Sequence, residues 1–277
     1  MSRRLGFFLI LLWPLFWSWA AFAESAAASY TIAVVPQFKP QQIEQEWRPL
    51  LDRIGAETGI SFKLIHYTSI PEFEKGFLAG EPDFAYMNPY HAVMAYHAQD
   101  YIPLVRDREP LSGILVVTEH SPIQRLQDLA GATIAFPAPN AYGASLLIRA
   151  ALDQEHVQFN ASYVKTHSNV YRQVALGFVQ AGGGVFRTLA DQPLEIRDGL
   201  RVLYETPKSA PHPIAVHPRV PVKVRAAFAR AFLGLYDDEA GRAMLAGVRI
   251  PDPVTADYAR DYRPLEQLHL DKYVSVD

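Results

Sequence analysis

The sequence predicts an α/β protein of two lobes joined by a hinge of two chain crossings. Three observations lead to this fold class. Short β-like runs alternate with helix-like runs, Pro- and Gly-containing stretches interrupt the alternation at residues 107–113 and 206–213, and the same alternation resumes between them. We expect residues 110–211 to form one lobe, and residues 24–109 with 212–277 to form the other.

The first 23 residues differ from the rest of the chain. Arg3 and Arg4 precede a nearly unbroken apolar run at residues 5–20, and residues 21–23 read Ala-Phe-Ala, a pattern that signal peptidase accepts. The alternative is a membrane anchor, but the run is short for a spanning helix and contains Pro14. We therefore expect a signal peptide that is cleaved after Ala23.

The remaining elements follow from periodicity and from turn residues. A buried β-like run begins the mature chain, and an amphipathic helix opens at Pro40 and ends before Gly59. The first segment is predicted to hold strands at residues 30–35, 62–66, 84–87 and 101–105, and helices at residues 40–57, 71–79 and 89–99. Such βαβα alternation predicts a mainly parallel sheet covered on both faces.

The middle and last segments continue this pattern. Strands are expected at residues 112–118, 134–136, 162–164 and 181–185, and helices at residues 123–129, 141–152 and 168–176. After the second interruption we expect a strand at residues 214–216, a helix at residues 222–235 and a helical C-terminal tail. Because the last segment follows the second crossing, it is expected to rejoin the first lobe.

Composition limits the class of function. The chain contains no cysteine, so neither a disulfide nor a lipidated N-terminal cysteine is expected. Loss of the signal peptide lowers Lys+Arg from 26 to 24 against 29 Asp+Glu, a net charge of about −5. Nucleic acid is then an unfavourable partner, because its binding depends on clustered Lys and Arg. We expect a soluble, monomeric protein of the periplasm.

No catalytic or metal-binding motif is evident. The sequence has no cysteine nucleophile, no G-x-S-x-G elbow, no phosphate-binding Walker loop and no H-E-x-x-H motif. His91 and His97 lie six residues apart on a predicted helix, which does not place two ligands on one face. Residues 182–184, three glycines, fit a turn or a close backbone approach better than a phosphate cradle. We expect a protein that is not an enzyme and has neither cofactor nor metal.

Polar residues gather at three junctions where a strand or loop leads into a helix. Helix starts carry unpaired N–H groups and the positive end of the helix dipole, so several that converge in one cleft would bind an oxyanion. The alternative is that Asn and Ser only cap these helices. The candidate ligand-binding residues are Tyr86, Asn88, Asn140, Ala141, Tyr142, Gly143, His167 and Ser168.

These junctions, together with other segments in the same order, resemble the PhnD-like family of periplasmic receptors for phosphate, phosphite and phosphonates that serve ABC importers. The resemblance covers nearly the whole mature chain and implies a type II periplasmic-binding-protein fold. The similar segments are residues 39–51, 83–89, 120–131, 136–143, 167 and 177–182.

The resemblance also implies roles for single residues. In the family, a Ser-Thr-Ser-Gly loop at a helix start, a histidine and an aromatic residue hold the phosphate-like group. Residues 140–143, His167 and Tyr86 occupy these positions here. Two loop hydroxyls are missing, and we expect the backbone N–H groups and the Tyr142 hydroxyl to donate in their place.

Further departures bear on the ligand. Gln180 replaces a common Asp, and the positions near which aminophosphonate receptors use carboxylates read Arg187 and His212, so we expect an amine-free anion. Together with Ser69, these three residues form a second group of candidates.

The resemblance implies capture of a small oxyanion by closure of two lobes, followed by recognition by an inner-membrane protein. That reader is an ABC permease or, as the alternative, the sensor of a two-component histidine kinase. An exported hydrolase with His167 as general base is a remote third interpretation.

Overall fold

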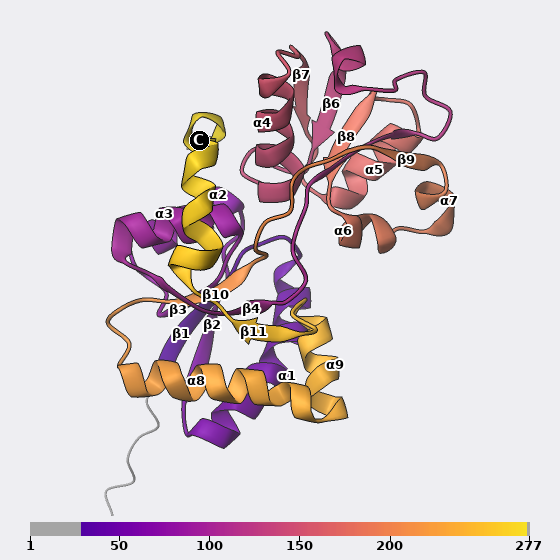
Figure 1. The fold of residues 1–277 in the computed structure, drawn as a ribbon. Helices are drawn as coiled ribbons and strands as arrows, with labels where there is room; N and C mark the ends of the chain where they lie inside the picture. The colour runs from indigo at the N-terminus through magenta and orange to yellow at the C-terminus, as the bar shows by residue number, and fades with distance from the viewer. Residues whose placement is uncertain (1–28, 276–277) are drawn as a thin grey trace, which may run out of the picture.

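The computed structural model describes residues 29–275, and it has two lobes, each built on its own β-sheet (Figure 1). The signal peptide expected at residues 1–23 lies outside the described residues. Within residues 29–275, no helix is long and apolar enough to cross a membrane.

Lobe I contains a six-stranded sheet in the order β11-β4-β10-β3-β1-β2. Figure 1 shows α1, α8 and α9 on one side of this sheet and α2 and α3 on the other. Its strands are β1 (Ser29–Val34), β2 (Ser61–Ile65), β3 (Phe84–Tyr86), β4 (Ile102–Asp107), β10 (Pro213–Val216) and β11 (Pro253–Thr255). Its helices are α1 (Pro40–Thr58), α2 (Ile70–Leu78), α3 (Pro89–Gln99), α8 (Val222–Gly234) and α9 (Glu239–Gly247).

Lobe II contains a five-stranded sheet in the order β7-β6-β8-β5-β9. Separate apolar clusters cover its two faces, one including Ile148 of α4 and the other Val170 of α5. The strands are β5 (Ile114–Thr118), β6 (Thr133–Phe136), β7 (Asn160–Tyr163), β8 (Ala181–Gly184) and β9 (Leu200–Glu205). The helices are α4 (Leu147–Gln154), α5 (His167–Ala175), α6 (Phe186–Ala190) and α7 (Leu194–Arg197); a 3-10 turn, η1 (Leu126–Leu129), and a π-helical turn, η2 (Tyr142–Leu146), complete the lobe.

The prediction of mainly parallel sheets was wrong, because both sheets are mixed. In lobe I, β1 runs parallel to β2 and β3, whereas β10 runs antiparallel to β3 and β4. In lobe II, β5 runs antiparallel to both β8 and β9. β5 and β10, which enter the two lobes from the hinge, are antiparallel to their neighbours, and β11 is antiparallel to β4. β9, α6 and α7 were not predicted.

Two chain crossings join the lobes, as predicted. One leads from β4 to β5 and the other from β9 to β10. The crossings pair with each other, since the N–H of Leu111 and the C=O of Ser209, and the reverse pair, are each 2.8 Å apart. At the start of lobe II the backbone of Gly113 packs so tightly that an added Cβ would lie 2.1 Å from the Gly143 carbonyl oxygen.

The C-terminal tail leaves lobe I after α9 and β11 and continues as three short turns. These are the π-helical turn η4 (Tyr258–Tyr262) and the 3-10 turns η5 (Arg263–Leu268) and η6 (Leu270–Tyr273). The tail packs on α3, where the rings of Tyr96 and Tyr258 stack at 3.6 Å. In Figure 1 its yellow end rises from lobe I toward α4 of lobe II.

Candidate functional site

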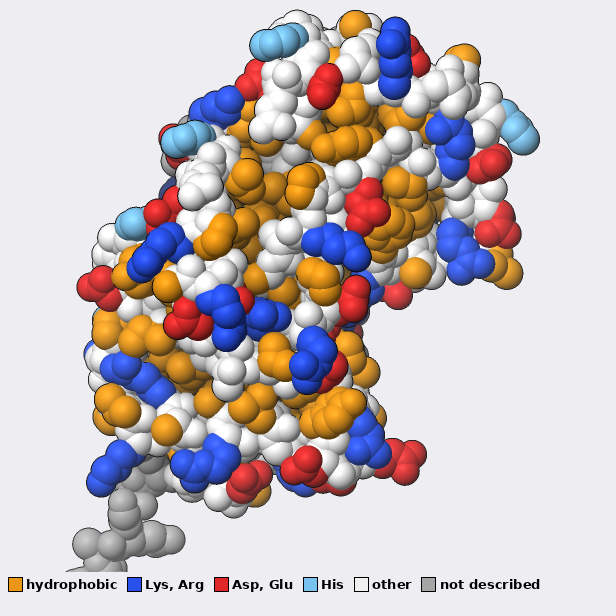
Figure 2. All heavy atoms as spheres, in the orientation of Figure 1, with side chains coloured by type: hydrophobic (Ala, Val, Ile, Leu, Met, Phe, Trp, Pro, Cys, Tyr) orange, Lys and Arg blue, Asp and Glu red, His pale blue; other side chains and the backbone are white. Residues whose placement is uncertain are grey.

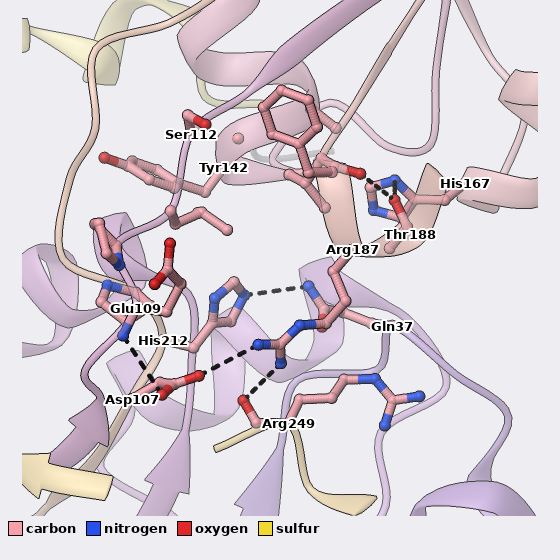
Figure 3. A pocket seen from close by; sticks show the side chains of 18 of the residues that line it. Gln37, Asp107, Glu109, Ser112, Tyr142, His167, Arg187, Thr188, His212 and Arg249 are labelled. Carbon is pink, nitrogen blue, oxygen red and sulfur yellow. Dashed lines mark hydrogen bonds and ion pairs between the residues drawn. The ribbon is translucent and has the colours of Figure 1, made fainter. Parts of the chain in front are cut away.

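A cavity of about 350 Å³ lies between the lobes, against the hinge. Its wall receives side chains from lobe I, from both crossings and from the helix starts of lobe II (Figure 3). Seven of the predicted residues line it: Tyr86, Ala141, Tyr142, Gly143, His167, Arg187 and His212.

Tyr86 brings a free hydroxyl to the cavity from the end of β3. Its ring packs between Trp47 and His212, with centroid distances of 5.1 and 5.5 Å, and only 6% of the residue is exposed. Burial raises the pKa of this hydroxyl, and no group within residues 29–275 hydrogen-bonds to it. Tyr86 therefore presents a protonated donor that has no protein partner in the described chain.

The π-helical turn η2 brings backbone donors to the same cavity. The N–H groups of Ser145 and Leu146 both donate to the Ala141 carbonyl, at 2.7 and 3.1 Å. No side chain of the described residues caps this helix start, and the N–H groups of its first residues have no intrahelical acceptor. Ala141, Tyr142, Gly143 and Ala144 all line the cavity, so this helix start, where an anion would be stabilised, lies at the cavity wall.

The Tyr142 hydroxyl does not take the role expected from the sequence. It donates to Ser209 Oγ in the hinge at 2.9 Å, and burial raises its pKa. The ring of Tyr142 lines the cavity and the hydroxyl is engaged elsewhere. Only the backbone is left to replace the missing loop hydroxyls.

His167 is the first residue of α5 and is held by Thr188. Its Nδ1 lies 3.2 Å from Thr188 Oγ1. Burial lowers the pKa of His167 to about 4, so the ring is neutral near pH 7. Thr188 has one hydroxyl proton, which it donates either to the Val185 carbonyl at 3.0 Å or to Nδ1; in the second case the neutral ring carries its proton on Nε2 and becomes a donor.

His212 is a second neutral histidine in the wall, on the hinge side. Its Nε2 lies 3.2 Å from Gln37 Nε2, an amide nitrogen that can only donate. With the amide in this orientation, the ring accepts at Nε2 and carries its proton on Nδ1. Burial, with smaller contributions from nearby cationic groups, lowers the pKa of His212 to about 3.

The two arginines of the cavity wall are internally paired. Arg187 reaches from lobe II to lobe I, where it lies 3.2 Å from Asp107 Oδ2 and donates to the Arg249 carbonyl at 2.9 Å (Figure 3). Asp107 is only 3% exposed. Arg249 pairs with Glu46 at 3.1 Å and lies over the Phe38 ring at 4.1 Å. Arg187 thus ties the lobes together across the cavity.

Sequence reasoning missed most of the hinge wall. Glu109 and Ser112 come from the first crossing, Glu205 from the end of β9 and Lys208 from the second crossing. Ser112 Oγ donates to the Glu205 carboxylate at 2.7 Å. The sequence did contain a signal for these residues. The interruptions at residues 107–113 and 206–213 predicted a hinge, and the hinge of a two-lobed protein borders its cleft.

Asn88 and Asn140 lie beside the cavity and do not line it. Asn88 caps α3, accepting at Oδ1 from the His91 N–H at 2.7 Å. The Asn140 amide is buried, 2.9 Å from each oxygen of Glu74. The structure therefore gives both side chains contacts within the protein in place of the ligand contacts expected.

Three further predicted residues lie away from the cavity. Ser69 caps α2, accepting from the Glu72 N–H at 3.3 Å. Gln180 accepts from the Thr133 N–H at 2.9 Å, and Ser168 is exposed at the second position of α5.

The described residues also contain no group of three or more His, Cys, Asp or Glu side chains that could hold a metal. On the face shown in Figure 2, Lys and Arg are interspersed with Asp and Glu.

Comparisons with known proteins agree with this architecture. Residues 32–262 match the family model described as ABC transporter, phosphonate, periplasmic substrate-binding protein. A curated relative, the phosphate-import protein PhnD of Mycolicibacterium smegmatis, is 24% identical over 169 residues, which are 58% of this chain and 51% of the relative. The match thus spans about half the length of that relative.

Solved structures show the same fold at low identity. A binding protein component of an ABC phosphonate transporter from Pseudomonas aeruginosa has a TM-score of 0.74 and 17% identity, covering 89% of this chain and 87% of its own. PhnD1 from Prochlorococcus marinus, in complex with methylphosphonate, has a TM-score of 0.77 and 13% identity, covering 89% and 98%. Both support the two-lobed fold predicted from the sequence.

Proposed function

The chain belongs to the family of periplasmic substrate-binding proteins of ABC phosphonate transporters, and from this premise we propose that its interlobe cavity captures a phosphonate or phosphate-like oxyanion for an ABC importer. One observation carries the proposal. The uncapped start of η2, His167 at the start of α5 and Tyr86, whose hydroxyl has no partner in the described chain, line a single cavity from both lobes. None of the matches described above favours a sensor kinase as the partner.

Capture would proceed by closure of the lobes. We take the division at residues 110 and 211 as the boundary of the moving parts, with residues 24–109 and 212–277 in one lobe. An anion that first meets η2 and His167 on lobe II would gain the Tyr86 hydroxyl of lobe I only when the lobes approach. Ligand binding therefore favours the closed arrangement, because only that arrangement completes the set of donors.

Neutral donors suit an oxyanion in a closed cavity. A buried anion must exchange its hydration for hydrogen bonds, and N–H and O–H groups aimed at it supply them without burying a counter-charge. His212 and His167 have lowered pKa values and so stay neutral near pH 7. They can donate from one ring nitrogen each.

The carboxylates of the hinge wall bear on the choice of anion. The sequence predicted an amine-free ligand, because Arg187 and His212 occupy positions near which aminophosphonate receptors use carboxylates. Glu109 and Glu205 line the cavity from other positions, and a carboxylate favours a nearby ammonium group. These two carboxylates would also accept the ammonium group of an aminophosphonate, so the ligand panel includes one.

The test uses the protein without residues 1–23. Inorganic phosphate, phosphite, methylphosphonate and 2-aminoethylphosphonate would be compared by thermal shift and then by calorimetry. A ligand at about 100 times its Kd should stabilise the folded state by about 2.7 kcal/mol. Absence of binding to every member of the panel would refute the proposal, as would turnover of a phosphate ester with loss of activity in His167→Gln.

A further inference from the structure

A buried polar cluster beside the cavity ties the two lobes together at Asn140, which lies just before the start of η2. Asn140 is 3% exposed, and its Nδ2 donates to both Glu74 oxygens at 2.9 Å and to the Ser275 carbonyl at 2.8 Å. Its Oδ1 accepts from the Ser275 N–H at 2.9 Å. Glu74 lies on α2 of lobe I, and Ser275 follows the last turn of the tail.

Lobe I surrounds Asn140 with matched partners. Asn88 Nδ2 donates to the Asn140 carbonyl at 3.2 Å, and His91 Nε2 lies 2.9 Å from Glu74 Oε1. Glu74, Asn88 and His91 are each at most 5% exposed. We call Asn140, Glu74, Asn88, His91 and Ser275 together the Asn140 clasp. Every hydrogen bond of Asn140 named here joins lobe II to lobe I or to the tail.

The end of the tail makes a second connection to lobe II. Lys272 Nζ and the Tyr273 hydroxyl each lie 2.7 Å from Asp153 Oδ2, and Arg149 Nη1 donates to the Tyr273 carbonyl at 2.8 Å. Leu270, just before these residues, is fully buried in an apolar cluster that takes side chains from both lobes, and Tyr258 earlier in the tail stacks on Tyr96 of lobe I. The tail is thus anchored in lobe I and bound to α4 of lobe II, as its course in Figure 1 illustrates.

These contacts depend on the arrangement of the lobes. If lobe II rotated away about the hinge, the Asn140 amide would leave Glu74, and a buried carboxylate that loses its donor is costly. Asp153 would at the same time leave Lys272 and Tyr273. Both sets of contacts therefore stabilise the closed arrangement and contribute nothing once the lobes separate.

We propose that Asn140 is a positioning residue: its clasp, supported by the C-terminal tail, fixes the start of η2 against lobe I and sets the balance of open and closed lobes before any ligand binds. The η2 backbone donors that the proposed function places on the anion follow closely after Asn140. The clasp would thus hold them at the cavity and raise affinity without touching the ligand, because a binding-competent arrangement that is already populated costs less to select.

The experiment measures lobe opening directly. Small-angle X-ray scattering would give the radius of gyration of the ligand-free protein without residues 1–23. The variants are Asn140→Ala, which removes the centre of the clasp, and Asp153→Ala, which frees the tail at an exposed residue. Asn160→Ala is the matched control, since Asn160 bonds only within lobe II, to the Gly131 carbonyl at 3.1 Å.

We expect both test variants to be less compact than the control. Loss of several hydrogen bonds should shift the closed-to-open ratio by about ten-fold, and the affinity for methylphosphonate should fall by up to about the same factor. At saturating ligand the radii should converge. A purely structural role would lower Tm and leave the radius unchanged.

The proposal is overturned if Asn140→Ala and Asp153→Ala are both as compact as the control without ligand. Should Asn140→Ala fail to fold, Asp153→Ala decides alone. Because the scattering measurement needs no ligand, its outcome is separate from that of the proposed function, which the ligand panel tests.

Discussion

Lowering the pH from about 7 to about 5 should destabilise the protein through the two histidines of the cavity wall. Burial lowers the pKa of His167 to about 4 and that of His212 to about 3. In the unfolded chain both rings take up a proton near pH 6.5, whereas in the folded protein each ring remains neutral until the pH approaches its lowered pKa. The unfolded state therefore binds more protons between these limits, and the free energy of unfolding falls as the pH falls.

The size of the effect follows from the width of this window. Each pH unit below about 6.5 costs at most about 1.4 kcal/mol per histidine that stays neutral when folded, which gives an upper limit of about 2 kcal/mol per ring at about pH 5. Both His212 and His167 are partly exposed, and solvent screening reduces the share of each to about 1 kcal/mol. Burial would raise the pKa of Asp261, but hydrogen bonds from Arg260 and Arg106 lower it to about 2. The stability that Asp261 contributes is therefore lost only at more acidic pH.

The assay is urea unfolding at the two pH values for the wild type and His212→Gln. The substitution should remove about 1 kcal/mol of the pH-dependent loss, because glutamine cannot titrate. His120→Gln, at an exposed position, is the control and should keep the wild-type slope. If His212→Gln loses stability with pH as steeply as the wild type, the assignment of the loss to His212 is wrong.

Three other predictions test the site and the hinge. Tyr86→Phe should weaken binding of the oxyanion by about ten-fold to a hundred-fold, as expected for loss of a hydrogen bond to a charged group, and calorimetry showing unchanged affinity would exclude Tyr86 as a ligand donor. Trp47, which packs on Tyr86 at 5.1 Å, should change its emission on ligand addition, and an unresponsive spectrum at saturation would contradict contact of the ligand with Tyr86. Gly113→Ala should cost about 3 kcal/mol or more in urea unfolding, because its Cβ would lie 2.1 Å from the Gly143 oxygen, whereas Gly234→Ala meets nothing within 4 Å and should be tolerated.

Local signals allowed most helices to be predicted close to their observed bounds. Pro40 and Pro89 occupy first helical positions, and Gly59 ends α1 with a φ of 71°, which favours glycine. Strand direction carries no such local signal. Whether β5 and β10 run parallel or antiparallel depends on where the hinge returns each strand, so the mixed sheets were not foreseen.

The residues of the candidate site also fall into two groups, those that a local motif predicts and those that only the fold brings together. Tyr86 and His167 were predicted because each stands at a junction between elements, where a short motif can be recognised. Asn140 stands at such a junction too, but its partner Glu74 is 66 positions away in the sequence. Glu109 lies in a hinge segment that has no periodicity, Glu205 ends a strand that was not predicted, and only the fold brings them to one wall.

The charges of the wall bear on how the cavity would select an anion. Arg187 is held by Asp107 and Arg249 by Glu46, so neither guanidinium is an uncompensated cation. Apart from Glu109, Glu205 and Lys208, which are exposed side chains of the hinge wall, the groups left to meet a ligand are neutral donors, namely backbone N–H groups, Tyr86 and the two histidines. Fixed dipoles of this kind need little reorganisation when charge arrives, and they stabilise an anion most where water is excluded. Selection would then depend on closure, because the same donors facing open solvent would favour the anion far less. This links the proposed capture of an oxyanion to the Asn140 clasp, since whatever stabilises the closed lobes also strengthens every one of these neutral contacts.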